Sequence, residues 1–168
     1  ISQRKSKDVS KNIVNTASAK STLINSYMFD TTLNYIISSK AKTQPEVISD
    51  STSWGNYHNA SFTFTNASYS PDWSNYAKVT ASTTKQSGTW WILTTGATTN
   101  RNAAKNIHDL AGNLLELTTE NYNGSGSTSA RGGICDNNGD SYPAAYRRSL
   151  NVASIYEYVG FRLGLYIL

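Results

Sequence analysis

The side chains with the greatest capacity for catalysis are few and far apart in this chain of 168 residues. The single cysteine, Cys135, can supply one thiolate, which excludes an intrachain disulfide and a zinc site of clustered thiolates. His58 and His108 are widely separated, and neither lies in an H-x-x-x-H or H-E-x-x-H sequence. No G-x-S-x-G sequence, Walker-type loop or dinucleotide fingerprint is present. The residue types therefore predict a protein that is not an enzyme.

A different chemistry, that of ligand binding, is concentrated in residues 134–158. Tyrosine gives a broad contact face at low entropic cost, while Asn, Ser and Asp adapt their hydrogen bonds to a partner. Tyrosine and arginine are also enriched in binding hot spots. The side chains expected to contact a ligand are Ile134, Cys135, Asp136, Asn138, Ser141, Tyr142, Tyr146, Arg148, Ser149, Asn151, Ser154, Tyr156 and Tyr158. The alternative is that the tyrosines form a lid over a small core.

Hydrophobic periodicity predicts the elements that position this segment. Four apolar residues recur at helical spacing, Phe29, Leu33, Ile36 and Ile37. They predict a helix that begins at an N-cap, Ser26, and ends near residues 39–42, before Pro45. Short strands are expected at 61–65, 90–93 and 115–118, with a longer strand at 159–167 whose odd-numbered apolar residues, including Leu163, face the core.

Loops occupy most of the remaining sequence. They are expected at 43–89, with short strands, at the Gly/Ser/Asn turn 121–129, and at 134–158. The fold class that follows is α+β, with a small, mostly antiparallel sheet, one or two helices and long loops. Residues 1–22 are expected as an arm or irregular first element, and residues 23–168 as a single domain.

The positive charge is confined to the start of the chain. The net charge is +4, and residues 1–20 account for all of it, with five basic groups and one acidic group. The rest is neutral, which argues against nucleic-acid binding. No apolar run is long enough to span a membrane. The start at Ile1, without methionine or signal peptide, is typical of a processed chain.

Four segments resemble, in order, motifs of the formylglycine-generating enzyme (sulfatase-modifying factor) family, whose fold is a variant of the C-type lectin fold. They are L-I-N-S-Y-M-F-D at 23–30, N-I-H-D-L-A-G-N-L-L-E-L-T at 106–118, R-G-G at 131–133 and G-F-R at 160–162. The second is the most specific, and together they span the chain from residue 23 to its end. The resemblance implies a C-type lectin-like fold.

The same motifs have a physical reading. Asp109 and Asn113 bracket a glycine, which is the composition of a turn before a strand. Gly132 and Gly133 permit a backbone shape that other residues resist. Arg162 needs a partner if it is covered, and Glu116 and Asp109 are both candidates.

The family's oxidase chemistry requires a pair of copper-binding cysteines between R-G-G and G-F-R. This chain has only Cys135 there, at a position that matches neither cysteine, so the oxygen-dependent oxidase is the least favoured function. Some members bind calcium near the G-N-x-x-E segment, and Asn113 and Glu116 keep those residue types. No other cofactor is expected.

The chain also looks like the non-enzymatic variable proteins of diversity-generating retroelements, found in phages, bacteria and archaea. In these the segment after R-G-G is diversified at adenines in Asn codons, which never yields Lys, Glu, Gln, Met or Trp. Residues 134–158 contain one such residue, Glu157, in 25 positions, whereas the other 143 positions contain 20. We therefore expect a display protein on a cell surface or phage virion that binds a protein or other macromolecule. The alternative is a tail or surface adhesin of fixed sequence that binds glycan or protein.

Overall fold

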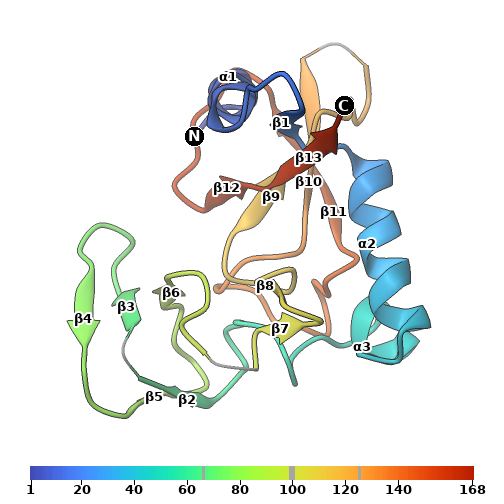
Figure 1. The fold of residues 1–168 in the computed structure, drawn as a ribbon. Helices are drawn as coiled ribbons and strands as arrows, with labels where there is room; N and C mark the ends of the chain where they lie inside the picture. Colours follow the sequence, from blue (N-terminus) through green and yellow to red (C-terminus); the bar gives the residue numbers. More distant parts are fainter. Residues whose placement is uncertain (66, 99–100, 125) are drawn as a thin grey trace. The chain divides into compact units, whose positions relative to one another are not determined.

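A computed structural model describes residues 1–65, 67–98, 101–124 and 126–168 (Figure 1). The predicted turn at 121–129 therefore includes one position, Ser125, that lies outside the described residues. The helices are α1 (Gln3–Ile13), α2 (Ser26–Ser38) and α3 (Gln44–Ile48). The strands are β1 (Ala19–Leu23), β2 (Phe62–Phe64), β3 (Ala67–Ser70), β4 (Ala77–Val79), β5 (Thr83–Lys85), β6 (Ile92–Leu93), β7 (Ala103–Ala104), β8 (Ile107–His108), β9 (Leu115–Leu117), β10 (Ser127–Arg131), β11 (Arg147–Asn151), β12 (Val159–Phe161) and β13 (Leu163–Ile167). The chain is thus α+β, with few helices and several small, mostly antiparallel sheets.

The chain folds into two compact units, each built from separate segments. The first unit contains Ile1–Thr32, Leu115–Arg131 and Arg147–Leu168. The second unit contains Leu33–Leu114 and Gly132–Tyr146. The boundary near residue 32 falls within α2, so that helix begins in one unit and ends in the other.

Two sheets make up the first unit. One is four-stranded in the order β11-β10-β9-β12, with β12 parallel to β9 and the other pairs antiparallel. The other is the antiparallel pair of β1 and β13, next to which α1 lies (Figure 1). The larger sheet contributes five buried apolar side chains, those of Leu115, Leu117, Ala130, Leu150 and Val159.

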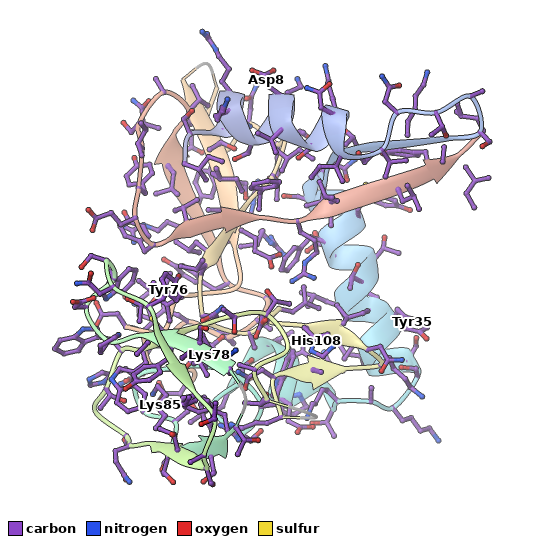
Figure 2. The ribbon with its side chains drawn as sticks, turned by 60° about the vertical axis from the view of Figure 1, so that its left-hand side comes forward. Asp8, Tyr35, Tyr76, Lys78, Lys85 and His108 are labelled. Carbon is purple, nitrogen blue, oxygen red and sulfur yellow. The ribbon has the colours of Figure 1, made fainter. Side chains whose placement is uncertain are left out.

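Residues 1–22, expected as an arm or irregular first element, are not irregular, because they form α1 and most of β1. The buried side of α1 consists of Ser6 and Ser10 rather than apolar residues. Ser10 donates to the Ser6 carbonyl over 2.6 Å, and Ser21 of β1 donates to the Ser10 carbonyl. Buried serines produce no run of large apolar residues, so α1 lacks the apolar period that marks α2, although Ser2 caps its start. The charged residues of α1 are exposed, as Figure 2 shows for Asp8.

Helix α2 confirms the predicted element. Phe29, Leu33 and Ile36 are buried, with 5% exposure or less, at the expected helical spacing. The cap is one residue earlier than predicted, because the Asn25 side chain accepts a hydrogen bond from the Met28 backbone N–H over 2.8 Å.

Pro45 does not simply follow α2, but lies in the first turn of a further helix, α3. The Thr43 side chain accepts from the Glu46 N–H, and Glu46 Oε2 accepts from the Thr43 N–H over 2.7 Å. This reciprocal pair is a capping box, and proline fits the first turn because its missing N–H would be unpaired there. The signal T-x-P-E was present in the sequence.

The second unit contains three small sheets, β2-β5, β4-β3-β6 and β7-β8. Trp54, Tyr57 and Val47 are buried, with 1% exposure or less. The strands predicted at 61–65 and 90–93 are confirmed in part as β2 and β6. Trp90, however, precedes β6 and is 46% exposed, so its expected place in a buried strand is wrong.

The long strand predicted at 159–167 is interrupted at Arg162. Its first part, β12, pairs with β9, and its second part, β13, pairs with β1. In β13 the buried residue is Gly164, while Leu163, Leu165 and Ile167 are 36%, 60% and 86% exposed. Leu163 is therefore not the core residue that the alternation predicted.

The reason lies at Gly164, where β13 approaches α2. A Cβ atom at this position would overlap the Met28 Cε atom, and the Tyr166 hydroxyl on the same side lies 3.5 Å from Met28 Sδ. Glycine allows this close approach, which places the leucines on the opposite side. Periodicity finds the alternation but not which side is covered.

Candidate ligand-binding surface

The segment predicted to bind a ligand is divided between the two units. Residues 134–146 belong to the second unit and residues 147–158 to the first. Each part is therefore a candidate surface of its own unit.

In the second unit the loop from Gly132 to Tyr146 has a backbone fixed by many hydrogen bonds. The Gly132 N–H donates to the Tyr146 carbonyl over 3.1 Å, which closes the loop at its base. Ser51 holds the loop from beneath, because its N–H donates to the Gly139 carbonyl and its Oγ accepts from the Ala144 N–H. A loop with so many backbone partners presents its side chains from a defined frame.

This frame exposes polar side chains and one aromatic pair. Asp136, Asn138 and Ser141 are exposed. Tyr142 and Tyr146 are partly buried and pack edge to face, with ring centroids 4.7 Å apart. The polar members of the predicted set are thus accessible, and the two tyrosines lie between the core and the solvent.

Ile134 and Cys135 are not displayed. Their exposed fractions are 6% and 0%, so the expectation that they reach a ligand is wrong. Cys135 donates from Sγ to the Trp90 carbonyl over 3.2 Å, and its N–H donates to the Asn113 carbonyl. Burial raises the pKa of the Cys135 thiol to about 12. These residues anchor the loop that carries Asp136.

In the first unit the predicted residues lie on β11 and the turn that follows it. β11 is an edge strand of the larger sheet, and Arg148, Ser149 and Asn151 are exposed while Leu150 is buried. Arg147 forms an ion pair with Glu120 and stacks over the Tyr122 ring, 4.7 Å from its centroid. An edge strand with exposed Arg, Ser and Asn offers both backbone and side-chain donors to a partner.

The last tyrosines of the segment form a second aromatic pair. Tyr156 and Tyr158 have ring centroids 5.4 Å apart and are partly buried, as is Ser154. The Asn151 N–H donates to the Tyr156 hydroxyl over 3.2 Å, so this ring packs against the end of β11. None of the four tyrosines of the predicted surface is a fully buried core residue.

The residues of the N-I-H-D-L-A-G-N segment are structural. Asp109, Gly112 and Asn113 all have positive φ angles, of 57°, 70° and 65°. Asn113 Oδ1 accepts from the Leu93 N–H over 3.0 Å, and its Nδ2 donates to the Leu93 carbonyl over 3.1 Å. The chain bends here before β9, but the Asn113 side chain binds the backbone of β6 rather than that of its own segment.

The R-G-G segment also has a structural role. Gly133 has φ +75°, and a Cβ there would lie 2.6 Å from the Tyr142 carbonyl oxygen, which explains the need for glycine. Arg131 forms an ion pair with Asp30 and lies over the Phe29 ring, 4.9 Å from its centroid.

Arg162 pairs with Glu116, one of the two partners expected for it. Arg162 Nε donates to Glu116 Oε2 over 2.9 Å, and its Nη2 reaches Oε1. Burial raises the pKa of Glu116, and the guanidinium offsets part of that effect. The G-F-R and G-N-x-x-E segments are therefore joined by a bidentate ion pair.

The calcium candidates do not fit a cation site. Asn113 Oδ1 already accepts hydrogen bonds from the Leu93 N–H and from Asn56 Nδ2, and both Glu116 oxygens face Arg162. Asn113 and Glu116 also belong to different units. Among the described residues no three His, Cys, Asp or Glu side chains are grouped as metal ligands would be.

One buried charged residue, Lys85, has no signal in the sequence. Lys85, labelled in Figure 2, donates from Nζ to the carbonyls of Tyr57 and Ala60, over 2.8 and 3.1 Å. Its exposed fraction is 0%, and burial lowers its pKa to about 8. The two carbonyls accept hydrogen bonds from the ammonium group, so the lysine links β5 to the backbone of residues 57–60 within the second unit.

In the part of the chain that the structure describes, every helix is too short or too polar to cross a membrane. Comparison with known proteins finds no match to a family model, to a curated protein or to a solved structure.

Proposed function

We propose that this chain is a non-catalytic ligand-binding protein with a C-type lectin-like fold, and specifically the variable protein of a diversity-generating retroelement. In this proposal residues 136–158 carry the diversified positions, and the ligand is a protein or another macromolecule met at a cell surface or by a phage virion. The single observation that supports it most is the division of the segment by exposure. Its exposed positions carry polar residues, except for Ala153 and Ile155, while its buried positions carry small or apolar ones.

The exposed and partly buried residues define the proposed contact set. On the second unit it contains Asp136, Asn138, Ser141, Tyr142 and Tyr146, and on the first unit Arg148, Ser149, Asn151, Ser154, Tyr156 and Tyr158. Ile134 and Cys135 leave the set because a ligand cannot reach them without opening the loop. Substitution at the exposed positions costs little stability, whereas substitution in the anchors disturbs the core. Such a division allows the frame of each unit to present many surfaces.

Two features of the site support a role without catalysis. The only thiol is buried, with its pKa raised to about 12, so it forms little thiolate at neutral pH. The buried acid Glu116 is held in an ion pair rather than aimed at a substrate. These groups support the frame and carry out no step of a reaction.

The encoding DNA tests the proposal directly. We expect a near-copy of the codons for residues 134–158 close by, differing at adenines, with a reverse transcriptase gene beside it. The differences should fall on codons of the contact set and spare Ala144 and Leu150, which are buried. A complete genome without such a copy contradicts the retroelement proposal and favours an adhesin of fixed sequence.

Thermal unfolding tests the display of the tyrosines against the lid alternative. We expect the double variants Tyr142→Ala/Tyr146→Ala and Tyr156→Ala/Tyr158→Ala to change Tm by less than about 4 °C, because these rings are partly exposed. A decrease of more than about 10 °C in both variants, as for core truncation, would show that the tyrosines are a lid.

A further inference from the structure

A shallow depression in the second unit is lined by two indole rings and one carboxylate. Trp73, Trp90 and Asp136 border a volume of about 290 Å³. Trp90 is 46% exposed, Trp73 is partly exposed, and Asp136 is exposed. Large aromatic surface left open to solvent beside a charge is a feature that core packing does not explain.

The Trp90 side of the depression is fixed before any ligand arrives. The His58 ring stacks on Trp90 with an interplanar angle of 12° and a centroid distance of 6.4 Å. The backbone N–H of His58 donates to the carbonyl of Asn137, the residue after Asp136, over 2.8 Å. On the other side of Asp136, Cys135 Sγ donates to the Trp90 carbonyl over 3.2 Å. These contacts hold the Asp136 backbone beside Trp90, which lowers the ordering cost of binding.

Trp73 is held in a conformation that bulky residues rarely adopt. Its φ angle is +67°, in the left-handed region. The preceding residue, Asp72, stabilises this turn, because its Oδ1 accepts from the N–H groups of Ser74 and Asn75 over 3.1 and 2.8 Å. Such a cost persists only where the surroundings impose it, and here the result is an indole at the edge of the depression.

We propose that Trp73, Trp90 and Asp136 bind a trimethylammonium group. The faces of indole rings attract a desolvated organic cation, and quaternary ammonium groups are typical ligands of aromatic sites. The Asp136 carboxylate supplies the opposite charge, and none of the three lining residues is basic. A sugar is held mainly through several hydrogen bonds to its hydroxyl groups, whereas Asp136 is the one carboxylate among these three lining residues. The proposal shares one residue, Asp136, with the proposed contact set and does not otherwise rest on the display function.

Choline chloride is the probe, and 3,3-dimethyl-1-butanol is its uncharged isostere. We expect choline to shift the indole N–H signals of Trp73 and Trp90 saturably in ¹⁵N NMR spectra of the full chain, while the buried Trp54 stays in place. Sodium chloride at equal concentration corrects for ionic strength. The isostere should bind at least about fivefold more weakly, since it lacks the cation–π and ion-pair attraction.

Matched variants separate the site from general charge effects. Asp136→Asn should weaken choline binding about threefold or more, whereas Asp140→Asn, an equal loss of charge at an exposed position four residues later, should not. Trp73→Ala should abolish saturable binding while the dispersion of the remaining NMR signals shows that the chain is folded.

Three outcomes would overturn the proposal. One is equal binding of choline and its isostere, which indicates an apolar depression only. Another is equal weakening by Asp136→Asn and Asp140→Asn. The third is a response of the two indoles to methyl glucoside but not to choline, which indicates a sugar site.

Discussion

Two buried polar side chains of the second unit are paired with backbone groups. Asn113 binds both backbone groups of Leu93, and Lys85 binds two carbonyls. Each removes unsatisfied backbone groups from the core, which would otherwise cost about 1–3 kcal/mol apiece. These residues therefore contribute to the frame of the unit through side-chain bonds to its backbone.

Lys85 makes the stability depend on pH in a narrow window. The native lysine, with its pKa lowered to about 8, loses its proton above pH 8, while in the unfolded chain it keeps the proton to about 10.5. The unfolded state then binds more protons, so the free energy of unfolding rises with pH, by about 1 kcal/mol between pH 8 and 9. Urea titrations at a series of pH values measure this rise.

Cys135 sets the upper pH limit of this rise in the free energy of unfolding. Its pKa is about 12 in the native state against 9.0 normally, so above pH 9 the unfolded thiol ionises first and stability falls with pH. Lys85→Met should remove the rise between pH 8 and 9, and Cys135→Ala should extend it toward 10.5. An unchanged rise in Lys85→Met would show that another group causes it.

Sequence reasoning found residues whose role is local or electrostatic. The need for glycine at Gly133 and the pairing of Arg162 with Glu116 follow from backbone freedom and from charge, and both are confirmed. The burial of Lys85 and Ile134 could not be predicted, because it depends on segments distant in the sequence. A hydrophobicity pattern gives a residue's tendency to be buried but not the neighbours that cover it.

At the level of elements, those with a strong apolar period were predictable. Helix α2 and the strands β2 and β9 occur where periodicity places them. Helix α1 was missed because serines form its buried side, and α3 because its signal is a cap rather than a period. Whether a single proline ends one helix or begins another depends on the residues around it, here Thr43 and Glu46.

The exposed leucines of β13 allow a test of whether the hydrophobic alternation or the observed burial decides the effect of a substitution. Leu165 is 60% exposed, whereas Leu117 of β9 is 1% exposed. Leu165→Thr should therefore change the free energy of unfolding by less than about 0.5 kcal/mol, while Leu117→Ala should lower it by about 2–5 kcal/mol. Chemical denaturation of both variants measures the difference. A loss above about 2 kcal/mol in Leu165→Thr would show that β13 is covered in solution.

For the whole molecule, the connectivity of the two units limits how they can unfold. The chain passes from one unit to the other at four places, near residues 32, 114, 131 and 146. The first unit takes strands from three segments. The segment with β9 and β10 is joined at both ends to the second unit, so unfolding of the second unit frees both ends of that segment. Neither unit is a continuous stretch that can be excised as an independent domain.

Calorimetry tests this dependence of each unit on the other. We expect one cooperative transition, with equal calorimetric and van't Hoff enthalpies. The reason is that each unit contains a segment joined at both ends to the other unit, so unfolding of either unit frees the ends of that segment. Removal of residues 147–168 should abolish the transition, since it takes β11, β12 and β13 from the first unit. Two separated transitions, or a truncated chain that still melts cooperatively, would show that the second unit folds alone. A ligand bound to residues of either unit should raise the same single Tm, because binding to the native state stabilises the whole cooperative unit.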